Sequence, residues 1–533
     1  MKGRKIIAQA IIGGHTQFLT KAQGMPKHVE KALTKITRQF MWEDDSSPRI
    51  AMELLHKPME EGGLNLIDIQ ARNEAIDIIW LKAYLNFSPT RPKWAIVVNM
   101  IIDEIAPPAT NRIARVNAFL QSWTIPTRGQ RANHLNGDII RMVKVGTKHK
   151  LDLTAIRISP QLRAQLPAWY HRDSAPCPIR SNASKCLLER HSIKKVTDLL
   201  QVSARIHNPR PNQDHRPIQN CTCIECIKDR LRECRNPHGC AQEALTRIQR
   251  IAPKLNPLRD DRHGDLSLTA RRKTRNETAK RTQGAIIFDP SITCKNDLSE
   301  CFRIFTNPER ATNIPAERLR PRGPNLTHQE IAIYTDGACF NNGKENAKCG
   351  SGIWISPNHE WNKAIRVPGE AQSNQIGEIS AVITAATITP HSYPLKIITD
   401  SKYVIEGMTT HLSKWEDRGW IGIRNTQALK KAAFTLKKRT AITMFQWVKG
   451  HEGDQGNEES DRLAKEGAEK NKPDHLDWEI PKEFDLQGAK LSALTQATAY
   501  KGILEKKPPK TRRSTTTNLQ RAKHISKIQK KLN

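Results

Sequence analysis

Residues 331–338, I-A-I-Y-T-D-G-A, have the pattern of a buried strand that runs into an acidic residue and a glycine turn. A second apolar strand is expected at 394–400, P-L-K-I-I-T-D, and it also ends in an aspartate. In open α/β sheets, ligands bind at the edge formed by the C-terminal ends of the strands, because the loops there leave a crevice. If the two strands are neighbours, the carboxylates of Asp336 and Asp400 converge. The two stretches therefore predict an α/β sheet with an acidic site at one edge.

The stretches on either side alternate between strand and helix patterns up to about residue 470. The expected elements are strands at 350–356 and 361–367, helices over 374–388 and 424–438, a strand at 441–448 and a final helix. Glu378 is expected in the first turn of the first helix, and Asp461 lies on the last one. Carboxylates gathered in one place repel one another, so they favour hard divalent cations. Two such ions could activate a water and stabilise the leaving oxygen of a phosphodiester.

Four motifs in this region carry a resemblance to a known family. They are T-D-G-A-C from Thr335, S-N-Q-I-G-E from Ser373, T-D-S-K-Y-V from Thr399 and V-K-G-H-E-G-D-Q-G-N-E-E-S-D from Val448. In order and spacing they resemble the signatures of type-one ribonuclease H, over residues 329–470. The resemblance implies a five-stranded mixed sheet flanked by helices. It also implies endonucleolytic hydrolysis of the RNA strand of RNA–DNA hybrids with two Mg²⁺ or Mn²⁺ ions.

The resemblance also assigns roles to individual residues. The metal-binding carboxylates of the family match Asp336, Glu378, Asp400 and Asp461. His451 matches a mobile histidine that assists proton transfer and product release. Asn374 and Gln375 match positions that contact the hybrid, where the 2′-hydroxyl marks RNA. Trp415 and Trp420 fall where the family has its substrate-binding protrusion, although two tryptophans at this spacing equally suit a core.

Each motif taken alone has a commoner structural explanation. An aspartate in T-D-G is typical of a turn, and T-D-S is typical of a helix cap. Glu378 alone would suit the start of a helix. Five matches in the right order and on the right elements favour the enzyme. A catalytically inactive, nucleic-acid-binding remnant is the alternative.

A cluster of five cysteines and one histidine lies between residues 216 and 245, with a C-x-x-C at Cys223 and Cys226. Together with Cys234, and with His238 or Cys240, this pair could form a four-ligand zinc site. The spacing fits no common zinc finger, and free cysteines are the alternative. The eleven cysteines, five of them in this cluster, do not resemble a secreted disulfide framework in a chain of this length, so we expect an intracellular protein of the nucleus or cytoplasm.

The composition is strongly basic, with a formal net charge of +32 over 533 residues. Residues 331–470 are nearly balanced, with 18 Lys/Arg against 16 Asp/Glu, so the excess lies in the flanks. Basic flanks indicate a polyanionic partner, because Lys and Arg that neutralise phosphates release counterions. We therefore expect the flanks to bind the nucleic-acid backbone. No apolar run is long enough to cross a membrane.

The N-terminal third resembles the region that follows the polymerase core in non-LTR (LINE-like) retrotransposons. The resemblance rests on G-M-P-K-H-V-E-K-A-L-T-K-I-T-R-Q-F-M-W from Gly24 and on E-E-G-G-L-N-L-I-D-I-Q-A-R-N-E-A-I from Glu60. The catalytic aspartates of a reverse transcriptase palm are not recognisable, so polymerase activity is not expected. The expected organisation is a helical region (1–105), an unassigned basic region (106–215), the cysteine cluster (216–245), a linker (246–328), the ribonuclease H-like domain (329–470) and a disordered basic tail (471–533).

Overall fold

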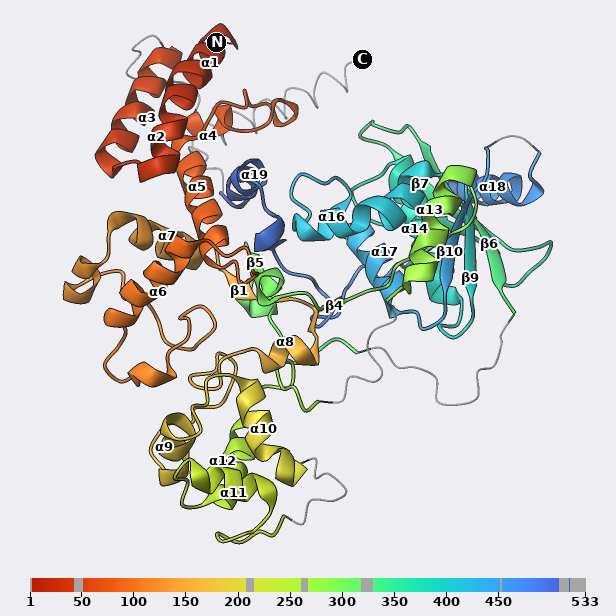
Figure 1. The fold of residues 1–533 in the computed structure, drawn as a ribbon. Helices are drawn as coiled ribbons and strands as arrows, with labels where there is room; N and C mark the ends of the chain where they lie inside the picture. The colour runs from red at the N-terminus through yellow and green to blue at the C-terminus, as the bar shows by residue number, and fades with distance from the viewer. Residues whose placement is uncertain are drawn as a thin grey trace.

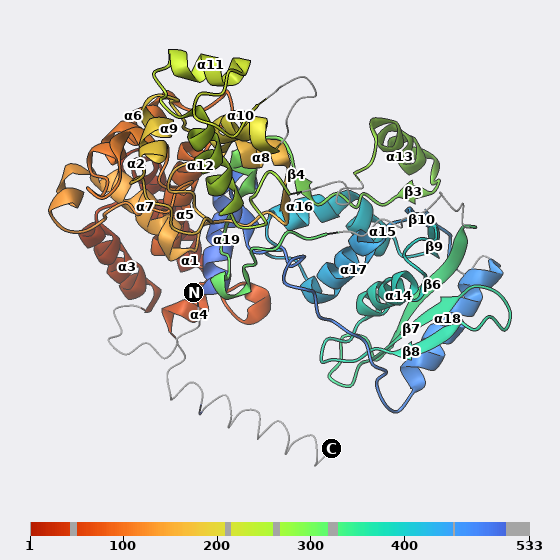
Figure 2. The same cartoon turned by 90° about the horizontal axis from the view of Figure 1, so that it is seen from below.

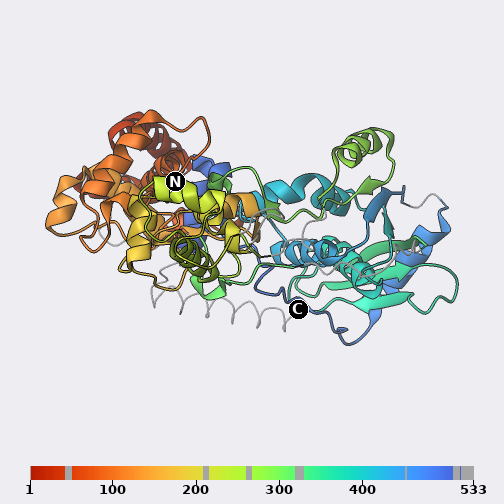
Figure 3. The ribbon, with the colours of Figure 1, turned by 60° about the horizontal axis from the view of Figure 1, so that its bottom comes forward.

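The computed structural model describes residues 2–42, 51–207, 215–259, 267–317, 329–450, 453–507 and 517. These residues form an N-terminal helical part, a module of helices that follows it, and a sheet domain (Figure 1). Figure 3 shows the helical part and the sheet domain at opposite ends of the molecule. No helix in the described part of the chain is long and apolar enough to span a membrane.

The N-terminal part consists of helices joined by short loops. Helix α5 is at its centre: Asp68 caps it by accepting a hydrogen bond from the Ala71 backbone nitrogen, and one face is buried in the largest apolar core. The helices are α1 (Lys2–Ala8), α2 (His15–Gln23), α3 (Lys27–Trp42), α4 (Met52–Leu55), α5 (Ile69–Tyr84), α6 (Lys93–Glu104) and α7 (Gly137–Lys148).

The middle of the chain forms a module of helices that projects from this part (Figure 1). Capping residues define its helix starts: Ser181 caps α9 and Asn236 caps α12. The helices are α8 (Pro160–Ala164), α9 (Asn182–Glu189), α10 (Val196–His207), α11 (Ile224–Leu231) and α12 (Pro237–Gln249). The strands β1 (Asp152–Leu153) and β2 (Arg157–Ile158) precede them.

The sheet domain contains a six-stranded mixed sheet in the order β3-β10-β9-β6-β7-β8. Five strands come from the region predicted to form the domain: β6 (Ile331–Phe340), β7 (Lys348–Trp354), β8 (Lys363–Arg366), β9 (Leu395–Thr399) and β10 (Thr443–Trp447). The central strand β6 runs parallel to β9 and antiparallel to β7. The mixed sheet and its helices fit the predicted α/β fold class, but the sheet has six strands and not the five that were expected.

The sixth strand, β3 (Ile286–Ile287), comes from the segment predicted to be a linker and pairs antiparallel with β10. The next residue, Phe288, is buried in the core of the sheet domain. Helix α13 (Ala270–Thr282) precedes the strand, and β4 (Thr293–Cys294) and β5 (Phe302–Ile304) follow it. The linker prediction is wrong for this stretch, because two-residue strands and a polar helix produce no recognisable periodicity.

Helices cover both faces of the six-stranded sheet. They are α14 (Asn374–Ile388), α15 (Lys402–Glu406), α16 (Leu412–Asp417), α17 (Thr426–Lys438) and α18 (Gln455–Glu469). Glycines allow two of them to approach closely. A Cβ on Gly337 of β6 would collide with the backbone of α14, and a Cβ on Gly352 of β7 would collide with the backbone of α18. Because Gly337 and Gly352 point to opposite faces, α14 and α18 lie on opposite sides of the sheet.

The segment after the sheet domain returns to the N-terminal part. Strand β11 (Ala489–Lys490) joins β1 and β5 in a small sheet, and α19 (Gln496–Lys506) packs beside α5, as Figures 1 and 2 show. The Tyr500 hydroxyl accepts a hydrogen bond of 2.9 Å from the Asp68 backbone nitrogen. The prediction of a disordered tail from residue 471 is therefore wrong up to Lys506. Residues 508–516 and 518–533 lie outside the described residues.

Candidate active site

Asp336 lies where the central strand parts from its parallel neighbour. The pairing of β6 with β9 covers Ile331–Tyr334, whereas the pairing with β7 continues to Phe340. Asp336 is thus in the middle of a strand, and not at a strand end as predicted. Its side chain is buried, and its Oδ1 accepts a hydrogen bond of 2.7 Å from the Gly337 backbone nitrogen. This hydrogen bond fixes one oxygen of the carboxylate.

Glu378 and Asp400 bring two more carboxylates to the same place. Glu378 is on α14, one residue beyond its first turn, and Asp400 directly follows β9. One carboxylate oxygen from each of Asp336, Glu378 and Asp400 lies within 4.8 Å of the other two. The close approach of α14 at Gly337 positions Glu378, because the missing Cβ would occupy the space of the Glu378 backbone nitrogen. The predicted convergence of these three residues is present.

Neighbouring carboxylates and burial raise the pKa of two members of this group, Asp336 and Glu378. Burial and the charge of Asp400 raise the pKa of Asp336 to about 7. Burial and the charge of Asp336 raise the pKa of Glu378 to about 8, while a hydrogen bond from Ser401 acts in the opposite direction. Oε2 of Glu378 is buried and has no hydrogen-bond partner. A site with this charge and an unsatisfied buried oxygen suits a cation with oxygen ligands.

Asp461 lies near this group but outside the set of three. It is on α18, and its Oδ2 accepts a hydrogen bond of 2.6 Å from Lys465, one turn further along the helix. Its charge contributes to the raised pKa of Asp336. Lys465 is a site residue that the motifs did not identify, and Ser401 lies within T-D-S-K-Y-V but was considered only as part of a helix cap. An Asp–Lys pair at i,i+4 on a helix was the available signal for Lys465.

His451 lies outside the described residues. The strand and loop that lead to it are described up to Gly450, which lies against the carboxylate of Asp400: a Cβ on Gly450 would be 2.6 Å from Oδ2 of Asp400. The role of His451 stays a prediction.

The predicted substrate-binding residues lie in different surroundings. Asn374 and Gln375 are the first two residues of α14, and Oε1 of Gln375 accepts a hydrogen bond of 3.0 Å from Asn425. Trp420 is only 5% exposed and belongs to the apolar core of the domain. The prediction that Trp420 binds substrate is therefore wrong. Trp415 is half-buried beside it, with ring centroids 6.0 Å apart, and stays a candidate.

The cysteine cluster does not form the single site that was predicted. Cys223 and Cys226 lie with Cys221 and His215, whereas Cys234 and Cys240 lie with Cys186 and His191. His238 belongs to neither group, and its ring stacks on that of His215. The sequence prediction missed Cys186, His191 and His215 because they lie outside the dense cluster.

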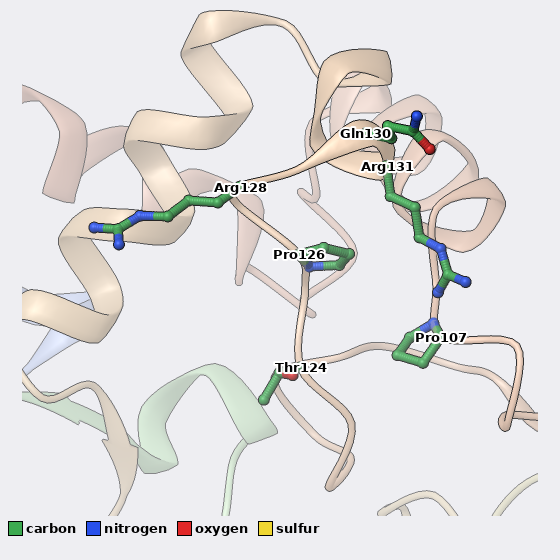
Figure 4. A pocket seen from close by; sticks show the side chains of 6 residues that line it. All are labelled: Pro107, Thr124, Pro126, Arg128, Gln130 and Arg131. Atoms are coloured by element: carbon green, nitrogen blue, oxygen red, sulfur yellow. The ribbon is translucent and has the colours of Figure 1, made fainter.

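A cavity of about 420 Å³ opens elsewhere, in the N-terminal part. It is lined by Pro107, Thr124, Pro126, Arg128, Gln130 and Arg131. Figure 4 shows the Arg131 side chain reaching toward Pro107, while that of Arg128 points away from the cavity. None of the acidic site residues lines it, so it is not part of the candidate active site.

Comparison with known proteins agrees with the geometry of the acidic site. The RNase H family model matches residues 328–469. Ribonuclease H1 of Rattus norvegicus is 37% identical over 148 residues, which cover 27% of this chain and 52% of the rat protein. Ribonuclease H of Pseudomonas aeruginosa is 35% identical over 145 residues, which cover 26% of this chain and 93% of the bacterial protein.

A crystal structure of a type 1 RNase H with the type 2 active-site motif is 24% identical, covers 27% of this chain and 74% of its own, and has a TM-score of 0.22. The chain belongs to the ribonuclease H family through its sheet domain. It spans about half the length of the mammalian relatives it matches.

Proposed function

We propose that the sheet domain hydrolyses the RNA strand of RNA–DNA hybrids endonucleolytically, leaving 3′-hydroxyl and 5′-phosphate ends. The observation that carries this proposal is the convergence of Asp336, Glu378 and Asp400 from three different elements. Membership of the ribonuclease H family supports the same reaction. The alternative, a catalytically inactive nucleic-acid-binding remnant, retains the fold but predicts no cleavage.

The three carboxylates fit a divalent-metal centre. All ligands are oxygen atoms, and the unpartnered Oε2 of Glu378 is a ligand atom without another role. Asp336, Glu378 and Asp400 would hold two Mg²⁺ or Mn²⁺ ions together with Asp461. The bound ions would supply an activated water and charge neutralisation at the phosphodiester.

The chain's own residues orient the reactants. The Gly337 backbone nitrogen fixes the Asp336 carboxylate, and Lys465 holds Asp461 beside the site. We assign to His451, just after Gly450, assistance in proton transfer and product release. Asn374 and Gln375 are proposed to contact the hybrid and to read the 2′-hydroxyl of the RNA strand.

The basic flanks are proposed to bind the phosphate backbone, and α13 is the clearest example. It carries six exposed basic residues, Arg271, Arg272, Lys273, Arg275, Lys280 and Arg281. Asn276 anchors the helix to β3: its amide donates to the Ile287 carbonyl at 2.7 Å and accepts from the Ile287 backbone nitrogen at 2.8 Å. Since β3 extends the catalytic sheet, α13 holds positive charge beside the domain, where it adds sequence-independent affinity.

We also infer that the chain comes from a LINE-like retroelement polyprotein. The support is the order of its parts: a region that resembles the segment after a polymerase core, then a cysteine-rich segment, then a ribonuclease H domain. Such a protein would meet RNA–DNA hybrids as products of reverse transcription.

The test is cleavage of a labelled RNA–DNA hybrid by the full chain, with Mg²⁺ and with EDTA. Asp400→Asn is expected to lower the rate at least about 100-fold, since even groups that only support metal ligands can cost that much. Asp477→Asn removes a carboxylate that is paired with Lys431 away from the site, and it should leave the rate unchanged. Hybrid binding without metal-dependent cutting by the folded wild-type chain would establish the inactive alternative.

A further inference from the structure

The helical module α9–α12 brings together two groups of sulfur and nitrogen atoms that the catalytic function does not use. We call them the first and second tetrads. The first tetrad is His215, Cys221, Cys223 and Cys226. The second tetrad is Cys186, His191, Cys234 and Cys240. In each tetrad, three thiols and one imidazole offer ligand atoms that all lie within 4.8 Å of one another.

The first tetrad is arranged around a common centre. Nδ1 of His215 is 3.5 Å from the sulfur of each of the three cysteines. One ring nitrogen has a single proton or a single lone pair, so hydrogen bonding does not account for three equal contacts. Tetrahedral coordination with Zn–S of about 2.3 Å and Zn–N of about 2.0–2.1 Å separates nitrogen from sulfur by roughly 3.6 Å. The observed distances match that geometry.

The second tetrad has similar dimensions and an unsatisfied imidazole. The sulfurs of Cys234 and Cys240 are not joined by a disulfide and lie 3.6 Å apart, close to the roughly 3.8 Å between two thiolates on one tetrahedral zinc. The His191 side chain is fully buried; Nδ1 faces a carboxylate oxygen of Asp229 at 3.4 Å without hydrogen-bond geometry, and Nε2 has no hydrogen-bond partner. A buried polar group without a partner is costly. Coordination of one nitrogen by a metal removes that cost.

A buried ion pair links the two tetrads. Arg205 donates to the sulfur of Cys226 in the first tetrad at 3.2 Å and to Oδ2 of Asp229 at 2.6 Å. Oδ1 of Asp229 is 3.4 Å from Nδ1 of His191 in the second tetrad. A carboxylate behind a histidine orients the ring so that its other nitrogen faces the metal. Arg205 offsets the negative charge that three thiolates leave on a zinc site.

The packing around α11 also indicates that cross-links, and not a core, hold this part of the module. Ile224 is 65% exposed and Leu231 is 80% exposed, so apolar side chains of α11 face solvent. Figure 2 shows α11 at the outer edge of the module, beyond α10 and α12. Segments that bury so little apolar surface usually need a disulfide or a metal to fold.

We infer that each tetrad binds one Zn²⁺ through three thiolates and one imidazole, and that the two ions hold the module together. Sulfur and imidazole ligands in tetrahedral arrangement favour zinc over Mg²⁺ or Ca²⁺, which take oxygen ligands. Both tetrads have four protein ligands, which is typical of structural and not catalytic zinc. The inference is independent of the nuclease activity proposed for the sheet domain.

The experiment is the zinc content of the full chain, purified under reducing conditions and dialysed against Mg²⁺ so that the carboxylates do not retain zinc. We expect two zinc ions per chain for the wild type, and one each for Cys223→Ser and Cys186→Ser. Cys177→Ser, which removes a cysteine outside both tetrads, should keep two. A folded wild-type chain with no bound zinc would overturn the inference.

Variants that fail to fold are covered by two measurements on the wild-type chain. Replacement of zinc by Co²⁺ should give thiolate-to-cobalt charge-transfer absorption that saturates at two equivalents. Thiol labelling of the denatured chain, without reductant, should find all eleven cysteines reactive. A pair of unreactive cysteines from either tetrad would identify a disulfide in place of metal and would contradict the inference.

The link between the tetrads has its own test. Arg205→Met should lower zinc affinity about 10–100-fold, as expected for a residue that supports the ligands. Because Arg205 contacts Cys226 and, through Asp229, the second tetrad, competition with a chelator should show both ions weakened. Arg232→Met, on the exposed end of α11, should leave both unchanged. Weakening of neither ion by Arg205→Met would refute the role of the link.

Discussion

Replacement of Asp336 by asparagine is expected to stabilise the metal-free sheet domain while it abolishes cleavage. Burial and Asp400 raise the pKa of Asp336 from 3.8 to about 7. Because the folded-state pKa lies above the unfolded value, the contribution of Asp336 to stability is fully present below pH 3.8 and is lost as the pH rises through about 7. Asparagine does not ionise, so the variant keeps this contribution to stability at high pH, where the wild type has lost it.

The size of the effect follows from the shift. At about 1.36 kcal/mol per pKa unit, roughly three units correspond to about 4 kcal/mol at pH 8 and about 1.5 kcal/mol at pH 5. Coupling to Glu378 and relaxation of the site reduce these figures, so we expect a gain of about 2–4 kcal/mol at pH 8. If the proposed metal site is correct, Mg²⁺ should bind the wild-type carboxylates and remove most of the difference.

The assay is native-state hydrogen exchange of peptides from β6 and β9 in EDTA, comparing variant and wild type at equal pH. Hydrogen exchange of these peptides reports opening of the sheet domain alone, whereas thermal unfolding of the whole chain combines the transitions of several structural parts. Asp477→Asn serves as the control, because Asp477 is paired with Lys431 and its replacement should bring no gain. An Asp336→Asn variant that is no more stable than the wild type at pH 8 would refute the electrostatic account of the site.

Three further changes test the geometry. Gly337→Ala should push α14 away from β6 and lower cleavage by up to about 100-fold in a hybrid assay, since small displacements of catalytic groups cost that much; Gly14→Ala, where a Cβ meets open space, should have no effect. Trp420→Ala should lower the free energy of opening of the sheet domain by about 3–5 kcal/mol in native-state hydrogen exchange, as for a core aromatic; a variant of unchanged stability with weakened hybrid binding would restore Trp420 as a substrate contact. Replacing Arg271, Arg272 and Arg275 of α13 by alanine should weaken hybrid binding and reduce its salt dependence by about one unit of log–log slope per lost phosphate contact, and an unchanged slope would exclude α13 from the interface.

The acidic site was predictable because its signals are local. Asp336 and Asp400 follow apolar strand segments, and Glu378 follows a helix start, so spacing along the chain already implies proximity in space. What the pattern did not contain is the role of Gly337, which is set by how closely a helix packs on the sheet. The burial of Trp420 likewise depends on tertiary packing, and spacing alone left core and surface equally open.

The parts of the fold that depend on long-range contacts have no comparable local pattern in the sequence. Strand β3 has two residues, and its pairing with β10 spans a separation of more than 150 positions in the sequence. Helix α19 is stabilised by contacts with α5, such as that between Tyr500 and Asp68. The second tetrad needs Cys186 and His191, which lie on and just after α9 and far from the dense cysteine cluster. Motif spacing therefore predicted one zinc site, where the fold brings together two groups of thiols and imidazoles.

The most direct test of the central claim compares one sequence as an RNA–DNA hybrid, an RNA duplex and a DNA duplex, each labelled on both strands. With Mg²⁺, the full chain is predicted to cut only the RNA strand of the hybrid and to leave 3′-hydroxyl and 5′-phosphate ends. Cutting of the DNA strand or equal cutting of all three duplexes would contradict the account, and so would hybrid cleavage that persists in Asp400→Asn.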